Sequence, residues 1–140
     1  MAHGAEDVRK PLDWDKLEIG EALPSFSYLL TQDMVDEFRA GVMDPEAAFP
    51  TISHKVDINA YHRAYKDVGS VNARCAFYCY RPPVPGKRIT VHAWIADKYM
   101  RRGKTYICTE AVSVDEDGHL LDRVVTHELK QPAEVGKKWG

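Results

Sequence analysis

The sequence has no long apolar run and no apolar leader at its start. Its mean hydropathy is −0.42, and no stretch approaches the ~18 to 20 consecutive apolar residues that a membrane-spanning helix needs. The first residues, Met-Ala-His-Gly-Ala-Glu, lack the apolar core of a signal peptide. We therefore expect a cytoplasmic protein with no membrane partner.

An excess of positive charge is also missing. Nineteen Lys and Arg residues stand against 21 Asp and Glu residues, which gives a formal net charge of −2 and an isoelectric point near 6.3. Proteins that bind the phosphate backbone of nucleic acids usually carry a strong basic bias. The composition therefore argues against nucleic acid as a partner.

Cysteine is scarce, with only Cys75, Cys79 and Cys108. Their number is odd, and none of them belongs to a Cys-x-x-Cys pair or has a Cys or His partner at zinc spacing. We expect buried thiols in a protein of a reducing compartment.

Several motifs of catalytic chemistry are absent. The sequence has no Gly-rich phosphate loop, no Gly-x-Ser-x-Gly nucleophile elbow and no Cys-His nucleophile pattern. His92, His119 and His127 do not have the spacing of metal ligands. We predict no bound cofactor and no metal site.

What is present is the composition of an ordinary globular protein of one domain. The chain has 140 residues, of which 44% are hydrophobic and 29% are charged. This length supports one core but not two. We expect a flexible N-terminus over residues 1–11, a single domain over 12–130 and a flexible tail over 131–140.

The first part of this domain predicts a strand followed by a helix. Apolar side chains alternate between Pro24 and Thr31, as in a half-buried strand. Thr31 can then cap a helix of about three turns that ends near Asp44 and Pro45.

Residues 53–68 predict a second helix, capped by Ser53 and closed by Gly69. The apolar arc of this helix consists of Val56, Ile58, Ala60, Tyr61, Ala64, Tyr65 and Val68. We expect Ala60 and Ala64 to face a sheet, because two alanines one turn apart allow a close approach. The opposite side carries Lys55, His62 and Lys66.

From Ser70 onward the apolar period changes to two, which indicates strands. The expected strands are 70–79, 89–95, 104–114 and 120–129, joined as an antiparallel meander. The first of them should present one apolar face made of Val71, Ala73, Cys75, Phe77 and Cys79. This order of elements predicts an α+β protein with a long antiparallel sheet wrapped around a central helix, which is the hot-dog fold.

Four motifs carry a family resemblance. They are Val71-Asn72-Ala73, Tyr80-Arg81-Pro82-Pro83-Val84-Pro85-Gly86-Lys87-Arg88-Ile89, Asp97-Lys98-Tyr99-Met100-Arg101-Arg102-Gly103-Lys104 and Asp115-Glu116-Asp117-Gly118. In their order and spacing the chain resembles the MaoC-like hydratases and dehydratases over most of residues 17–129. It is most similar to the non-catalytic N-terminal modules and non-catalytic dehydratase subunits of that family. The resemblance implies an acyl-CoA or acyl-carrier-protein thioester as the ligand.

Catalytic members of the family use an Asp and a His that hold and activate water. When the chain is aligned by position, Asp44 matches the Asp, but Phe49 stands where the His should be. His54 then falls at the family's His-Gly pair. In this register the imidazole chemistry is lost.

When the chain is aligned by pattern, Asp57 and His62 reproduce the spacing of the catalytic pair. On a continuous helix these two side chains point about 140° apart, so they cannot share one water. Asp57 either faces an acyl channel or lies at the surface near the start of the helix. Tyr61 and Tyr65 are either core residues or, with Asp57 and His54, contacts for the substrate.

These observations favour a non-catalytic subunit that shapes the acyl pocket for a catalytic hot-dog partner. Two alternatives remain open: a self-sufficient homodimeric (R)-specific enoyl-CoA hydratase that uses Asp57 and His62, and a non-enzymatic acyl-thioester binding protein. The basic turn over residues 101–104 either contacts coenzyme A phosphates or is a solvated hairpin tip.

Overall fold

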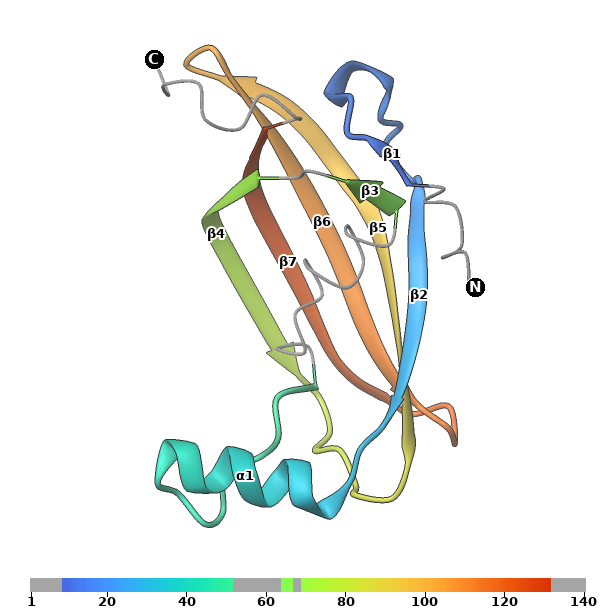
Figure 1. The fold of residues 1–140 in the computed structure, drawn as a ribbon, viewed down its shortest axis with the longest axis vertical. Helices are drawn as coiled ribbons and strands as arrows, with labels where there is room; N and C mark the ends of the chain where they lie inside the picture. Colours follow the sequence, from blue (N-terminus) through green and yellow to red (C-terminus); the bar gives the residue numbers. More distant parts are fainter. Residues whose placement is uncertain (1–8, 52–63, 67–68, 132–140) are drawn as a thin grey trace, which may run out of the picture.

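The computed structural model describes residues 9–51, 64–66 and 69–131. Their elements are β1 (Lys10–Pro11), η1 (Trp14–Lys16), β2 (Ala22–Leu29), α1 (Gln32–Val42), β3 (Tyr65–Lys66), β4 (Gly69–Cys79), β5 (Arg88–Arg101), β6 (Lys104–Asp115) and β7 (Leu120–Gln131). Five strands form one antiparallel sheet in the order β2-β5-β6-β7-β4, and α1 lies across one end of it (Figure 1). The expected long antiparallel sheet is confirmed.

The predicted strand and helix near the N-terminus are confirmed as β2 and α1. Thr31 caps the helix, since its hydroxyl accepts a hydrogen bond of 3.2 Å from the backbone N–H of Met34. This contact satisfies one of the backbone donors that the first turn leaves free. Met43 ends the helix in the left-handed conformation, with φ 54°.

The predicted four-stranded meander is wrong in one respect. Strands β5, β6 and β7 do follow one another as hairpins, but β4 pairs with β7 and not with β5. The connection over residues 80–87 begins against β7, where the backbone N–H of Tyr80 donates to the carbonyl of Leu121. It ends beside β2, where the N–H of Leu30 donates to the carbonyl of Lys87. This connection carries the chain across the end of the sheet, so β4 becomes an edge.

The single apolar face expected for β4 is also wrong. A register shift between Asn72 and Arg74 interrupts its pairing with β7. Because a bulge adds one residue to a strand, the alternation of side chains reverses across it. Val71 therefore lies on the opposite face from Cys75 and Phe77.

The end of the predicted second helix is wrong as well. Residues 52–63 and 67–68 lie outside the described residues, but Tyr65 and Lys66 form strand β3. They pair in parallel with Lys10 and Pro11 of β1. The prediction of helix is therefore wrong at Tyr65 and Lys66, where tertiary pairing overrides the helical period.

The core divides into two clusters on one face of the sheet. The larger contains Leu12, Leu17, Leu23, Phe26, Tyr65, Val91, Ala93, Ile95, Ile107, Ala111 and Val124. Ala64 packs against it, as the sequence predicts. The smaller cluster, beside α1, contains Leu30, Val35, Ile89 and Leu121. Within β5, the predicted alternation from Ile89 to Ile95 is confirmed.

Only one of the three cysteines is buried as expected. Cys108 is buried, whereas Cys75 and Cys79 are exposed. Both exposed thiols lie on β4, which has a sheet neighbour on one side only. The alternation of apolar residues in the local sequence does not reveal that β4 is an edge strand.

Candidate functional site

The structure describes only part of the site predicted from the sequence. His54, Asp57, Tyr61 and His62 lie outside the described residues. Tyr65 is described, and it is only 3% exposed in the larger core cluster. Burial and the nearby charge of Glu21 raise the pKa of its hydroxyl. Tyr65 is thus a neutral core residue, and its contact with a substrate stays a prediction.

Phe49, at the position where the family resemblance expects a catalytic His, is part of the hydrophobic packing. It packs against the smaller core cluster, and its ring meets Phe38 of α1 edge to face, with centroids 5.7 Å apart. Asp44, the matching acid, is exposed and accepts a hydrogen bond from the backbone N–H of Glu46. Phe49 and Asp44 therefore have structural contacts of their own.

A pocket of about 410 Å³ opens beside Phe49. Its walls come from the segment after α1, the end of β4, the connection over residues 80–87 and the start of β7. The lining residues are Ala48, Phe49, Pro50, Cys79, Tyr80, Arg81, Pro82, Pro83, Leu121 and Asp122. This lining is mostly apolar, with one carboxylate among the described residues.

The carboxylate of Asp122 is held in a chain of polar contacts. Asp122 is 8% exposed, and the Thr51 hydroxyl donates a hydrogen bond to its Oδ2 atom. The Tyr28 hydroxyl in turn donates to the Thr51 carbonyl at 3.2 Å. Burial, and then the charge of Asp122, raise the pKa of Tyr28, so the phenol remains a donor. These hydrogen-bonded groups of Tyr28, Thr51 and Asp122 can orient a polar group of a ligand or hold a proton.

Asp122 was not among the candidates that the sequence suggested. It shares the core face of β7 with Val124 and with a second buried carboxylate, Glu128, which is 4% exposed. The sequence could have suggested Asp122, because it places an acidic residue at a core-facing position of a strand. A buried carboxylate needs a partner or has a functional role.

A second polar group lies in the turn between β6 and β7. Single ligand atoms of Asp115, Asp117 and His119 lie within 4.8 Å of one another. The backbone N–H groups of Asp117 and His119 both donate to Asp115 Oδ1, and His119 Nδ1 lies 3.1 Å from Asp115 Oδ2. Lys87 forms an ion pair with Asp117. These hydrogen bonds and the ion pair stabilise the turn, and they explain why the three side chains lie close together.

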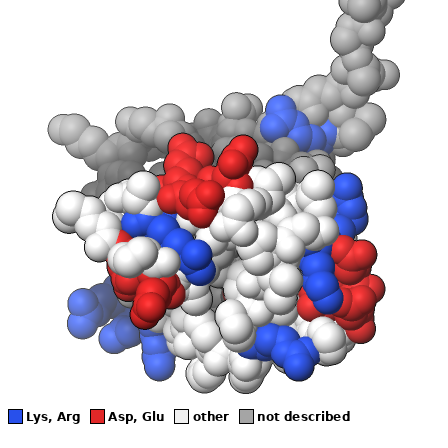
Figure 2. Space-filling view, turned by 90° about the horizontal axis from the view of Figure 1, so that it is seen from below, with Lys and Arg blue, Asp and Glu red and all other residues white. Residues whose placement is uncertain are grey.

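The charges at the α1 end of the molecule are mixed. Seen from below, Lys and Arg side chains alternate with Asp and Glu side chains around an uncharged surface (Figure 2). A surface of this kind does not attract ligands of one charge over a long range.

Comparison with solved structures identifies the fold. The chain superposes on a hot-dog-like protein from Thermanaerovibrio acidaminovorans with a TM-score of 0.59 and 12% identity, covering 86% of this chain and 89% of that one. The fold is the hot-dog fold. No protein-family profile matches the sequence, and no curated protein matches it either.

Two further solved structures that resemble the chain are dehydratases. One is the C-terminally truncated HadBC (3R-hydroxyacyl-ACP dehydratase) complex from Mycobacterium tuberculosis, with a TM-score of 0.64 and 16% identity, covering 81% of this chain and 96% of that one. Another is the MaoC-like dehydratase from Rhodospirillum rubrum, with a TM-score of 0.64 and 12% identity, covering 82% and 94%. No helix in the described part of this hot-dog chain is long and apolar enough to cross a membrane.

Proposed function

We propose that the chain is a non-catalytic subunit of a MaoC-like enoyl-thioester hydratase or 3-hydroxyacyl-thioester dehydratase. A catalytic hot-dog partner would supply the Asp and the His, and this chain would shape the acyl pocket. The ligand would be an acyl-CoA or acyl-carrier-protein thioester. The structural likeness to a two-component dehydratase complex supports this proposal.

The observation that carries the proposal is the packing of Phe49. Addition of water to an enoyl thioester needs a base for the water and an acid for the proton delivered to C2. A phenyl ring can do neither. Because Phe49 packs against Phe38 and the smaller core cluster, a His side chain could not take its place without leaving a polar group among apolar neighbours.

The pocket beside Phe49 suits the apolar part of such a ligand. Phe49, Pro50, Pro82, Pro83 and Leu121 offer hydrocarbon surface for an acyl chain. Asp122, whose carboxylate accepts a hydrogen bond from the Thr51 hydroxyl, adds one polar anchor at the same pocket. We propose that the acyl chain lies on these apolar residues.

An assay of crotonyl-CoA hydration tests the proposal. The isolated chain should show no turnover above the blank, because loss of one member of an acid-base pair typically removes a factor of ~10² to 10⁴ in rate. Turnover should appear when a hot-dog subunit that carries the Asp and His pair is added.

Two results would contradict the subunit assignment. Robust turnover by the isolated chain, lost in His62→Ala, would establish the self-sufficient hydratase. Binding of crotonyl-CoA without turnover in any combination of subunits would establish a non-enzymatic binding protein. His92→Ala is the matched control for His62→Ala, because His92 is exposed and lies outside the pocket.

A further inference from the structure

A second cavity, of about 510 Å³, opens on the opposite face of the sheet, at the end where β5 turns into β6. Ile107 of β6 points into the larger core cluster, so its neighbours Tyr106 and Cys108 point to the other face. The charged and aromatic side chains that line this cavity are Arg74 of β4, Tyr99 and Arg101 of β5, Arg102 of the turn, Tyr106 of β6 and His127 of β7. None of these residues contributes to the pocket beside Phe49.

The floor of the cavity is an ordered aromatic and polar network. Tyr99 and Tyr106 face each other across β5 and β6, and their rings stack with centroids 5.2 Å apart. The Tyr99 hydroxyl lies 3.0 Å from Nδ1 of His127, and Nε2 of the same ring lies 3.6 Å from Cys108 Sγ. Both nitrogens of His127 are therefore engaged, and the floor has a fixed shape.

Three guanidinium groups surround this floor. Arg74, Arg101 and Arg102 line the cavity, and no carboxylate is among its described lining residues. No ion pair links these three arginines to a described carboxylate, whereas Arg123 pairs with Glu110 and Lys87 with Asp117. Like charges gathered around one cavity repel each other, and an anion between them relieves that repulsion.

Arg102 occupies a backbone position that its own side chain does not favour. Its φ is 52°, and that of Gly103 is 75°, so both central residues of the two-residue hairpin are left-handed. Such a turn favours Asn followed by Gly. The sequence therefore places a guanidinium at the rim of the cavity where the local conformation alone would favour Asn.

We propose that this cavity binds a phosphate monoester. Three guanidinium groups offer more hydrogen-bond donors and more positive charge than the two oxygens and single negative charge of a carboxylate can match. A phosphate monoester offers three acceptor oxygens and a charge of about −1.5 to −2 near pH 7. The cavity shares no lining residue with the pocket beside Phe49, so phosphate binding here can be tested whether or not the function proposed above holds. The phosphate would belong either to coenzyme A, at its 3′ position, or to another phosphorylated small molecule.

Titration of the full chain with inorganic phosphate, followed by amide NMR at constant ionic strength, tests the proposal. The amides of residues around the cavity should shift with phosphate and not with chloride. Arg102→Asn should weaken phosphate binding about tenfold or more, because it removes charge-assisted hydrogen bonds. It should not harm the fold, because Asn followed by Gly suits the turn.

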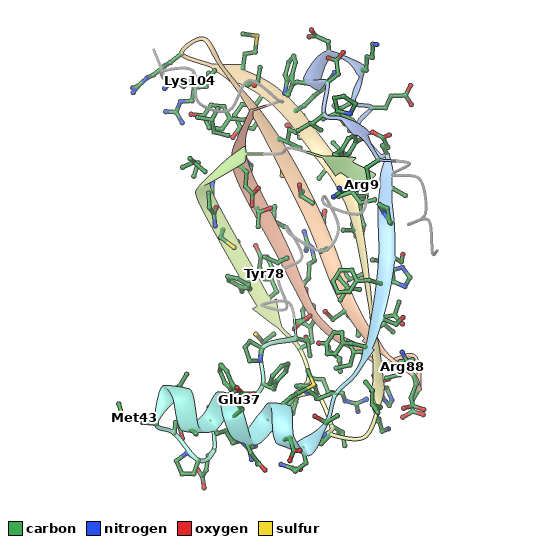
Figure 3. All side chains as sticks on the ribbon, viewed as in Figure 1. Arg9, Glu37, Met43, Tyr78, Arg88 and Lys104 are labelled. Carbon is green, nitrogen blue, oxygen red and sulfur yellow. The ribbon has the colours of Figure 1, made fainter. Side chains whose placement is uncertain are left out.

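Arg88→Gln is the matched control, because Arg88 is exposed at the other end of β5, far from the basic turn that Lys104 marks (Figure 3). This control should bind phosphate as the unaltered chain does. Equal weakening by Arg102→Asn and Arg88→Gln, weakening by neither, or the same shifts with chloride would overturn the proposal.

Competition identifies the source of the phosphate. Displacement of phosphate by coenzyme A and not by dephospho-coenzyme A would assign the site to the 3′-phosphate. Retention of phosphate in the presence of both would assign it to another phosphorylated small molecule. Each of these results supports the site itself.

Discussion

At the scale of single residues, Phe49 is the position where packing and the proposed function meet. Phe49→Ala should lower the free energy of unfolding by about 2 to 4 kcal/mol, because it removes a ring from the smaller core cluster and leaves a cavity against Phe38. This expected loss of stability is small for a Phe→Ala substitution, because Phe49 is only partly buried. Urea unfolding followed by circular dichroism measures it.

Met43→Ala provides the control for this change. Met43 is 90% exposed, so its truncation should change the free energy of unfolding by less than about 0.5 kcal/mol. Equal effects at Phe49 and Met43 would show that Phe49 is not a packing residue, and the argument against catalysis by this chain would lose its main support.

Asp115 gives the stability of the chain a dependence on acid pH. Burial by itself raises the pKa of this carboxyl, but hydrogen bonds from His119 and from the Asp117 backbone outweigh it, so the pKa lies below its ordinary value. A lowered pKa in the folded state means that the contribution is complete above the ordinary carboxyl pKa of about 4. It is lost as the pH falls through the folded pKa.

We therefore expect Asp115→Asn to flatten the loss of thermal stability between about pH 5 and pH 2. Melting temperatures across that range, for the unaltered chain and for the variant, measure the effect. Glu116→Gln is the matched control, since Glu116 lies in the same turn and is exposed. A slope in Asp115→Asn as steep as in the unaltered chain would contradict this role.

At the scale of elements, α1 depends on its first turn. Thr31→Ala removes the hydroxyl that accepts from the N–H of Met34, and should cost about 1 kcal/mol of stability. Thr31→Ser keeps that oxygen and should cost much less. Chemical denaturation of the three proteins measures the difference, and an equal loss in both variants would assign the effect to the Thr31 methyl group instead.

Strand β4 shows how an element can be recognised and yet be misplaced. Its alternation of apolar residues predicts a strand, and the strand is present at residues 69–79. Its neighbour is β7, because the chain crosses the end of the sheet before β5 begins. A local period of two carries no information about which strand will provide the hydrogen bonds.

At the scale of the whole molecule, the outer edge of β4 predicts association. This strand has 11 residues, and Val71, Phe77 and Tyr78 on it are 52%, 60% and 45% exposed. Long edge strands with exposed apolar side chains pair with another chain unless they are covered. Light scattering should therefore report an assembly and not a stable species of 15.9 kDa.

Phe77→Lys tests whether the association uses this edge. A charge on an edge strand opposes pairing, so the variant should shift the equilibrium toward the monomer. Val84→Lys is the matched control, because Val84 is 51% exposed but lies in the connection between β4 and β5. A monomeric unaltered chain, or equal dissociation in both variants, would place the interface elsewhere or remove it.

The sequence by itself determined those features that depend on near neighbours in the chain. The cap at Thr31, the extent of α1 and the core-facing alternation from Ile89 to Ile95 follow from hydrogen bonds and periods that span a few residues. The hot-dog fold could also be predicted, because the order of one strand, a helix and several long strands leaves few ways to bury the apolar faces.

Only the tertiary structure decided which surfaces the elements share. It placed Tyr65 in a strand with the N-terminal segment, reversed the faces of β4 at a bulge and left Cys75 and Cys79 exposed. It also gathered Arg74, from one edge of the sheet, with Arg102 of a distant turn around one cavity. These outcomes depend on contacts between residues far apart in the chain, and such contacts produce no periodic pattern in the local sequence.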